Sequence, residues 1–302
     1  MREYSGLDKI FIGNAKNNIV EGTLCLEGGA FRGIYTAGVI DCLMQNDINL
    51  RTAIGVSAGA LNGMSYIAGN IGRSGYCDLK HRHNKRWIGK RNLFKEGALV
   101  SYKFLFNDLE KEIPFNYDRF FNSGRKLISV VTNLRTGKAE YFDNHNSLIF
   151  KATKASSSMP FVSEPVKILD QKYLDGGCAT KLPIRYALEN GYEKIVFVGT
   201  RPISYRRKIS NKGEMITKLK YRKYPNFVKA MKESDSLYNS DMDLIEKLES
   251  EGKIFTICPS KLINIDRLEE NMEKLGEYYW LGFNDCKNKL DSLKEYLNIK
   301  KL

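Results

Sequence analysis

The feature that most restricts the fold of this chain is a serine framed by glycines, between an apolar segment and a helix-forming one. Residues 55–59 read Gly-Val-Ser-Ala-Gly, after Thr-Ala-Ile and before Ala-Leu-Asn-Gly-Met. This is the spacing of a nucleophile elbow, a sharp turn from a strand into a helix. Glycine at Gly55 and Gly59 leaves room for the tight backbone. The pattern therefore predicts that the Ser57 hydroxyl projects from the sheet edge beside the first amides of a helix.

Histidine is an unpromising general base for this serine. The chain has three histidines, His81, His83 and His145, and none in its second half. The first two lie in a strongly basic run and the third in a polar, turn-like cluster, where surface positions are the simplest interpretation. A triad in the order Ser, Asp or Glu, His needs a histidine well downstream of the elbow. We therefore expect the base to be another type of residue.

Asp175 is a carboxylate in a suitable setting. Residues 166–174 predict a hairpin with Asp170-Gln171 as its two-residue turn. Asp175 then ends the returning strand, and two glycines that let the main chain turn away follow it, Gly176 and Gly177. A carboxylate placed in this way can approach a serine hydroxyl directly. An ordinary Asp-Gly surface turn has the same spacing, so both interpretations stay open at this point.

A glycine-rich turn follows an apolar strand that begins at residue 24, and a helix is expected to begin after this turn, at Arg32 or Gly33. Such a turn presents several backbone N–H groups in one direction and can hold an anion. The anion is either a dinucleotide pyrophosphate, with Asp47 as the acidic residue of a dehydrogenase, or the oxyanion of an acyl intermediate. The residues of this turn are Gly28, Gly29, Ala30, Phe31, Arg32 and Gly33.

These three motifs, in this order, resemble those of the patatin-like phospholipases, over roughly residues 20–200. The resemblance implies that Ser57 is the nucleophile and Asp175 the general base of a two-residue dyad. It also implies that the backbone amides of the turn from Gly28 to Arg32 form the oxyanion hole. The family often has a third consecutive glycine where this chain has Ala30, which leaves the acyl-chain preference in question.

The resemblance further implies a doubly wound α/β fold, with a mainly parallel sheet between helices in three α/β/α layers. The implied activity is that of a lipid acyl hydrolase of the phospholipase A, lysophospholipase or carboxylesterase type, acting through an acyl-enzyme without metal or cofactor. The substrate would be a lipid or another acyl ester. An acyltransferase with the same dyad and a non-catalytic lipid-binding scaffold are the alternatives.

Composition agrees with a cytoplasmic protein. The chain has 302 residues, of which 42% are hydrophobic, with no apolar stretch of membrane-spanning length and no hydrophobic leader. The six cysteines are scattered without metal-ligand spacing, as expected in a reducing compartment. The net charge of +13 is concentrated in residues 80–95 and 201–223, where aromatic residues are interleaved. These segments predict either peripheral contact with an anionic membrane or a solvated surface; no nucleic-acid partner is expected.

The chain is expected to divide into a lead-in, a catalytic domain and a carboxy-terminal extension, at residues 1–20, 21–200 and 201–302. Within the catalytic domain, residues 65–125 are expected to cover the active site. Helical spacing of apolar residues and a strand ended by proline predict the elements of the extension: a helix over Phe227–Leu248, a strand over Lys253–Pro259, and helices over Arg267–Glu277 and Tyr279–Tyr296.

Overall fold

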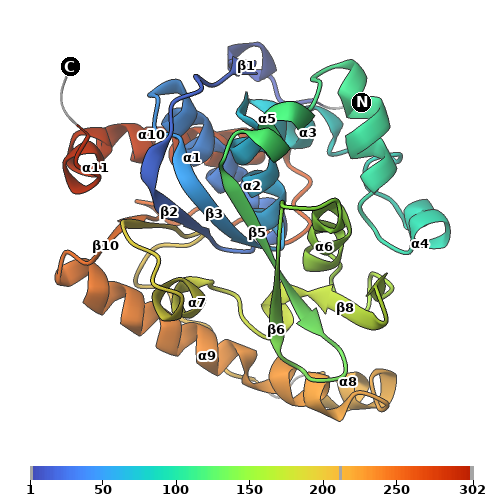
Figure 1. Cartoon of the computed structure of the whole chain (residues 1–302). Coiled ribbons are helices and arrows are strands. Elements are labelled where there is room, and N and C mark those ends of the chain that lie inside the picture. Colours follow the sequence, from blue (N-terminus) through green and yellow to red (C-terminus); the bar gives the residue numbers. More distant parts are fainter. Residues whose placement is uncertain (1–2, 211–212, 300–302) are drawn as a thin grey trace.

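The computed structural model describes residues 3–210 and 213–299. The parts of the lead-in, of the second basic segment and of the extension that lie outside the described residues are 1–2, 211–212 and 300–302. A central sheet has helices on both of its faces (Figure 1). The predicted fold class, a mostly parallel α/β sheet between helical layers with additional carboxy-terminal helices, is confirmed.

The sheet has eight strands, and the extension supplies one of its edges. Five neighbouring strands, β10, β9, β2, β3 and β5, run parallel. Strand β5 pairs antiparallel with both β6 and β8, and β8 pairs antiparallel with β7. The order is β10 (Ile254–Ile257), β9 (Ile195–Val198), β2 (Val20–Leu26), β3 (Leu50–Val56), β5 (Lys126–Asn133), β8 (Gln171–Asp175) and β7 (Val166–Ile168), with β6 (Ala139–Asp143) paired to β5. A separate two-stranded ribbon joins β1 (Gly13–Asn14) to β4 (Asn70–Ile71).

The two faces of the sheet carry separate hydrophobic cores because side chains alternate along a strand. On β2, Leu24 and Leu26 face one core and Cys25 faces the other. The first core contains apolar residues of α1 (Gly33–Gln45), α2 (Ala58–Ala68) and α10 (Met272–Asn288). The second contains residues of α7 (Ile184–Glu189) and α9 (Pro225–Ser250). The apolar periodicity of both strands and helices thus produces the three layers.

The carboxy-terminal helices belong to the main core. A Cβ atom on Gly38 of α1 would lie 2.0 Å from the carbonyl oxygen of Tyr279, and one on Gly282 of α10 would lie 2.1 Å from that of Tyr35. The backbones of α1 and α10 therefore approach too closely for any other residue at these two crossing points. The last short helix is α11 (Leu290–Tyr296).

The predicted boundaries of the last two helices were wrong. The structure has one helix, α10, across the expected break at residue 278, and residues 259–271 are not helical. The reason is tertiary, because Arg82 donates hydrogen bonds to the carbonyl oxygens of Leu268 and Glu269 (2.8 and 2.6 Å). These bonds hold the segment across the glycine-rich turn instead of leaving its backbone groups for a helix.

The predicted hairpin exists, but its turn is shifted by one residue. Ile168 pairs with Gln171, so the turn residues are Leu169 and Asp170 rather than Asp170 and Gln171. Leu169 has a φ of 51° and is 74% exposed, an unusual position for an apolar residue. The apolar side chain concealed the turn.

The other α-helices of the described residues are α3 (Arg73–His81), α4 (Lys90–Glu96), α5 (Tyr117–Asn122), α6 (Leu148–Ser156) and α8 (Glu214–Lys220).

Candidate active site

Ser57 lies on a strained turn between β3 and α2. Its φ of 56° and ψ of −121° are rarely adopted by a residue with a side chain, as expected of a nucleophile elbow. A Cβ on Gly55 would lie 2.5 Å from the Ala60 nitrogen, and one on Gly59 would lie 2.5 Å from the Leu26 carbonyl oxygen. Both glycines are therefore required by close backbone approach, as the sequence motif predicts.

Sheet register brings Asp175 to this turn. Strands β3 and β8 pair with successive stretches of β5, on the edge opposite β6: Val56 lies across from Val130, and Asp175 lies across from Val131. The parallel and the antiparallel strand therefore end at the same point along β5. The Ser57 hydroxyl donates a hydrogen bond of 2.7 Å to Oδ2 of Asp175, although 118 positions separate the two residues.

The carboxyl end of α6 holds both residues of this pair. The Ser57 amide donates to the Ser156 hydroxyl (2.8 Å), and the Asp175 amide donates to the Ser158 carbonyl oxygen (2.9 Å). The second carboxylate oxygen of Asp175 accepts from the Gly177 amide (2.8 Å). The hydroxyl and the carboxylate are thus fixed from both sides before any substrate binds.

The glycine-rich turn lies beside this pair, and only part of it has free amides. The Phe31 amide donates to the Arg267 carbonyl oxygen (3.4 Å) and the Arg32 amide to that of Gly29 (3.1 Å). The expectation that all amides from Gly28 to Arg32 are donors for an oxyanion is therefore too broad. Within the described part of the chain, no acceptor occupies the amides of Gly28, Gly29 and Ala30.

Ala30 takes up a conformation that favours glycine. Its φ is 50°, in the left-handed region where a side chain is unfavourable. This is the position at which the resemblance leads one to expect glycine. The alanine keeps the left-handed turn, and Gly28, Gly29 and Ala30 line the same recess as Ser57.

Burial changes the acidity of Asp175. The side chain is enclosed, and the resulting desolvation raises its pKa from 3.8 to about 6, although the hydrogen bonds from Ser57 and Gly177 act in the opposite direction. A carboxylate with this pKa is a stronger base than one in water and is still ionised at neutral pH. The Ser57 hydroxyl, the Asp175 carboxylate and the residues Gly28, Gly29 and Ala30 therefore line one recess.

The raised pKa of Asp175 predicts a pH-dependent cost to stability. The folded protein binds a proton at Asp175 more tightly than the unfolded chain, so ionisation destabilises the fold as pH rises from about 4 through 6. The full cost above pH 7 is about 3 kcal/mol. Asp175→Asn, which does not titrate, is expected to gain stability relative to wild type over this pH range. Urea unfolding at pH 4 and pH 8 measures the difference.

Asp170→Asn is the matched control, because the Asp170 side chain is 97% exposed. Its difference from wild type is expected to stay constant with pH. If the difference between Asp175→Asn and wild type is also constant, Asp175 does not carry the buried charge that the structure assigns to it.

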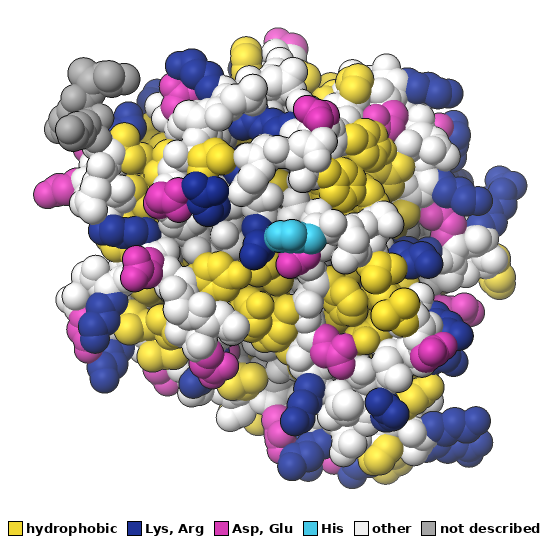
Figure 2. Space-filling view, in the orientation of Figure 1, with side chains coloured by type: hydrophobic (Ala, Val, Ile, Leu, Met, Phe, Trp, Pro, Cys, Tyr) yellow, Lys and Arg dark blue, Asp and Glu magenta, His cyan; other side chains and the backbone are white. Residues whose placement is uncertain are grey.

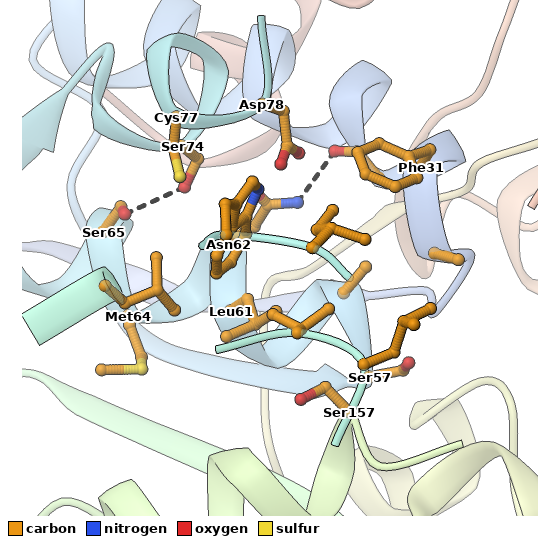
Figure 3. A pocket seen from close by; sticks show the side chains of 18 of the residues that line it. Phe31, Ser57, Leu61, Asn62, Met64, Ser65, Ser74, Cys77, Asp78 and Ser157 are labelled. Atoms are coloured by element: carbon orange, nitrogen blue, oxygen red, sulfur yellow. Dashed lines mark hydrogen bonds between the residues drawn. The ribbon is translucent and has the colours of Figure 1, made fainter. Parts of the chain in front are cut away.

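An apolar cavity of about 110 Å³ opens at Ser57. Figure 3 shows it between α2, which carries Leu61 and Met64, and α3, which carries Cys77. The Ser65 and Ser74 hydroxyls on its wall hydrogen-bond to each other (2.9 Å). Most of the wall is apolar, although Asn62, Arg73 and Asp78 also line it. The section expected to cover the active site also contributes apolar side chains to the wall, namely Trp87, Ile88, Leu99, Val100, Leu105 and Phe106.

The alternative candidates lie away from this site. Each histidine ring has a partner elsewhere: Glu112 for His81, the Glu270 carbonyl oxygen for His83, and Asp143 for His145. Asp47 precedes β3, at the end of the strand opposite to Ser57, and pairs with Lys16 (2.7 Å). This position does not fit the acidic residue of a dinucleotide site, which follows the second strand of such a fold.

Part of the charge in both basic segments is paired internally; in the second, Arg206 pairs with Asp243 and Glu246. In the first, Lys80 pairs with Glu112, and Arg82 lies buried over the Phe31 ring. Figure 2 shows hydrophobic patches between Lys and Arg side chains on one face of the molecule. Exposed apolar residues also occur on α4 and α8, namely Phe94, Met215, Ile216 and Leu219. Contact with an anionic membrane and the absence of a nucleic-acid partner stay predictions.

The described part of the chain is also informative about membranes and metals. No helix in residues 3–210 and 213–299 combines the length and the apolar character needed to cross a bilayer. Nor do these residues group three or more His, Cys, Asp or Glu side chains in a way that could hold a metal ion. That no metal or cofactor takes part in the chemistry stays a prediction.

Together, the mostly parallel sheet, the serine on its strained turn and the facing carboxylate define a three-layer α/β protein with the geometry of a nucleophile elbow. The chain belongs to the patatin-like phospholipase family, whose model matches residues 24–188. Its class is therefore that of the lipid hydrolases, and the resemblance seen in the sequence motifs is confirmed. A second model, a domain of unknown function named DUF6363, matches residues 224–298.

Several individual proteins are similar to this chain. The uncharacterized protein YjjU of Escherichia coli (strain K12) is 26% identical over 264 residues, which cover 86% of this chain and 74% of that protein. The probable lipid hydrolase 463L of Invertebrate iridescent virus 6 is 28% identical over 183 residues, 55% of this chain and 63% of that protein. The crystal structure of VipD from Legionella pneumophila matches with a TM-score of 0.49 and 15% identity, over 97% of this chain and 71% of that one.

Proposed function

We propose that this protein hydrolyses lipid acyl esters with a dyad of Ser57 and Asp175, through an acyl-enzyme intermediate. The observation that carries the proposal is the 2.7 Å hydrogen bond between the two side chains at the mouth of an apolar cavity. A buried carboxylate is otherwise costly, and here it faces the one serine that stands on a strained turn. The iridescent-virus relative named as a probable lipid hydrolase agrees with this activity.

The first half of the reaction forms the acyl-enzyme. Asp175 takes the proton of the Ser57 hydroxyl while its oxygen attacks the ester carbonyl carbon. The amides of Gly28, Gly29 and Ala30 donate to the oxygen on which negative charge develops. The carbon–oxygen bond to the alcohol then breaks, and the alcohol leaves with the proton held by Asp175.

The second half releases the fatty acid. A water molecule gives a proton to Asp175 and attacks the acyl carbonyl carbon. The same amides hold the oxyanion, the bond to Ser57 breaks, and the serine oxygen recovers the proton from Asp175. One ester and one water thus give one acid and one alcohol, and the carboxylate is regenerated. Enclosure of the site strengthens these hydrogen bonds because little water competes with them.

The acyl chain is assigned to the apolar cavity. A cavity of about 150 Å³ can hold benzene, so the 110 Å³ beside Ser57 takes about four or five carbons of an acyl chain without rearrangement. Leu61, one turn beyond Ser57 on α2, lies on the cavity wall (Figure 3). Its side chain therefore limits the space for the chain.

Leu61→Trp is expected to reduce the use of longer chains selectively. The indole fills the cavity, so the ratio of kcat/KM for p-nitrophenyl hexanoate to that for p-nitrophenyl acetate should fall by about tenfold or more, since each lost methylene contact costs about 1 kcal/mol. Leu61→Ala enlarges the cavity and should raise the ratio for decanoate against hexanoate. Unchanged ratios in both variants would place the acyl chain elsewhere.

Hydrolysis of p-nitrophenyl hexanoate and of dihexanoylglycerol by the purified protein tests the function itself. We expect turnover of both, with release of hexanoic acid identified by mass spectrometry. If neither ester is cleaved by a folded protein, the proposal fails; the dyad variants treated in the Discussion then test the assignment of residues.

A further inference from the structure

A second, wider recess meets the apolar cavity at Ser57. It has a volume of about 690 Å³ and is lined by both dyad residues and by Gly28, Gly29 and Ala30. Ser57 and Ala30 line both spaces. Since the cavity is assigned to the acyl chain, the alcohol side of the ester extends into this recess.

The recess is basic. Its charged wall residues are four cations and two carboxylates: Arg32, Lys181, Arg207 and Arg267 against Asp175 and Asp235. Asp235 is shared by Lys181 (3.2 Å) and Arg207 (3.6 Å), and Asp175 accepts the hydrogen bond from Ser57. No carboxylate in the described residues forms an ion pair with Arg32 or Arg267.

Arg32 is held in the wall with unused donors. The residue is 6% exposed, and its guanidinium makes one long hydrogen bond, from Nη1 to the Ile265 carbonyl oxygen (3.4 Å). Its Nε is buried without an acceptor among the described residues, and so is that of Arg207. A buried N–H group without a partner is unfavourable. These Nε atoms are closed to solvent, whereas Nη2 of Arg32 has no hydrogen-bond acceptor among the described residues and is the donor left for a ligand in the recess.

We propose that Arg32, Arg207 and Arg267 form a subsite for a phosphate or phosphodiester group on the alcohol side of the ester. This inference rests on the proposed function, because that function places the alcohol in the recess. Guanidinium groups present several N–H donors in a fixed fork and bind phosphate oxygens with two bonds at once. Three such groups, only one of them paired with a carboxylate, match an anion with several oxygens.

The carboxy-terminal part of the chain supplies two of these three cations. Arg207 precedes α9 in the chain and is held against it by Asn239. The Arg207 amide donates to the Asn239 side chain (2.7 Å), and the Arg207 carbonyl oxygen accepts from the same side chain (3.0 Å). The Arg267 carbonyl oxygen accepts from the Phe31 amide, which places Arg267 next to the glycine-rich turn. The catalytic part thus cleaves the ester, and the later segments select its alcohol.

Paired substrates test the subsite. Dihexanoylglycerol 3-phosphate and dihexanoylglycerol share their acyl chains and differ only in the phosphate. Arg267→Gln is expected to lower the ratio of kcat/KM for the phosphate ester to that for dihexanoylglycerol about ten- to hundredfold, mainly by raising KM for the phosphate ester, since a charge-assisted hydrogen bond to phosphate is lost. Arg267→Lys should restore part of the ratio because it keeps the charge.

Arg51→Gln is the matched control. It removes the same charge at the amino end of β3, at the opposite end of the strand from Ser57, where Arg51 pairs with Glu21. The ratio should not change in this variant. An unchanged ratio in both Arg267→Gln and Arg207→Gln would overturn the subsite.

Binding without turnover separates this inference from the proposed function. Ser57→Ala keeps the recess, and calorimetry of this variant with glycerol 3-phosphate and with inorganic phosphate is expected to show binding that Arg267→Gln weakens at least tenfold. Preference for glycerol 3-phosphate would assign the subsite to a lipid head group. Equal binding of inorganic phosphate, without discrimination between the two esters, would assign it to free phosphate. No binding of either probe would overturn the inference even if ester hydrolysis is observed.

Discussion

Ser57→Ala is expected to lower kcat/KM for p-nitrophenyl hexanoate by roughly 10⁴-fold or more, because the nucleophile is lost while the amide donors remain. The loss should appear in kcat. A fluorophosphonate probe is expected to label the wild-type protein at Ser57 and to leave the variant unlabelled, as detected by mass spectrometry of the peptides.

Ser147→Ala is the control for this variant. Ser147 is an exposed residue at the start of α6, and its side chain makes no capping hydrogen bond, so activity and labelling should match wild type. Wild-type turnover by a correctly folded Ser57→Ala protein would exclude the proposed nucleophile and favour a non-catalytic role for the elbow.

Asp175→Asn is expected to reduce kcat/KM by about 10³- to 10⁴-fold, since the amide keeps the shape but cannot take the serine proton. In the wild-type protein the base acts only when ionised. Because its pKa is raised to about 6, kcat/KM should be constant above pH 7 and should fall tenfold per pH unit below pH 6. A pH–rate profile between pH 4 and 9 measures this limb.

Asp170→Asn, five residues earlier in the same hairpin, should keep both the rate and the profile. The assignment of Asp175 fails if Asp175→Asn retains the acidic limb with substantial activity. The limb would then belong to another group, and the buried carboxylate would have only a structural role.

Local sequence predicts individual elements, whereas the three-layer fold was implied by the resemblance of the motifs. The glycines around Ser57 predict a tight strand-to-helix turn, and the apolar spacing after Phe227 predicts α9. Leu169 shows where this reasoning fails, because an apolar residue with positive φ gives no turn signal in the sequence. The course of residues 259–271 could not be predicted either, since the partner that fixes it, Arg82, is distant in sequence.

The same division holds for the site. Ser57 directly follows β3, and Asp175 is the last residue of β8. Glycines stand beside both residues in the sequence, so local patterns identify them as candidates. Their contact depends on how β3 and β8 share one edge of β5, and no local pattern contains that register. The cations at Arg207 and Arg267 were part of the overall basic charge, but only tertiary structure brings them to the recess beside Arg32.

The supports of the glycine-rich turn have a consequence for the timing of biosynthesis. Ile265 and Arg267, which accept from the side chain of Arg32 and the amide of Phe31, are translated more than 200 positions after the turn. At about 5–20 residues per second, roughly 10–50 seconds pass between the synthesis of Ser57 and that of Ile265 and Arg267. The glycine-rich turn therefore gains these supports only after most of the carboxy-terminal extension has been synthesised.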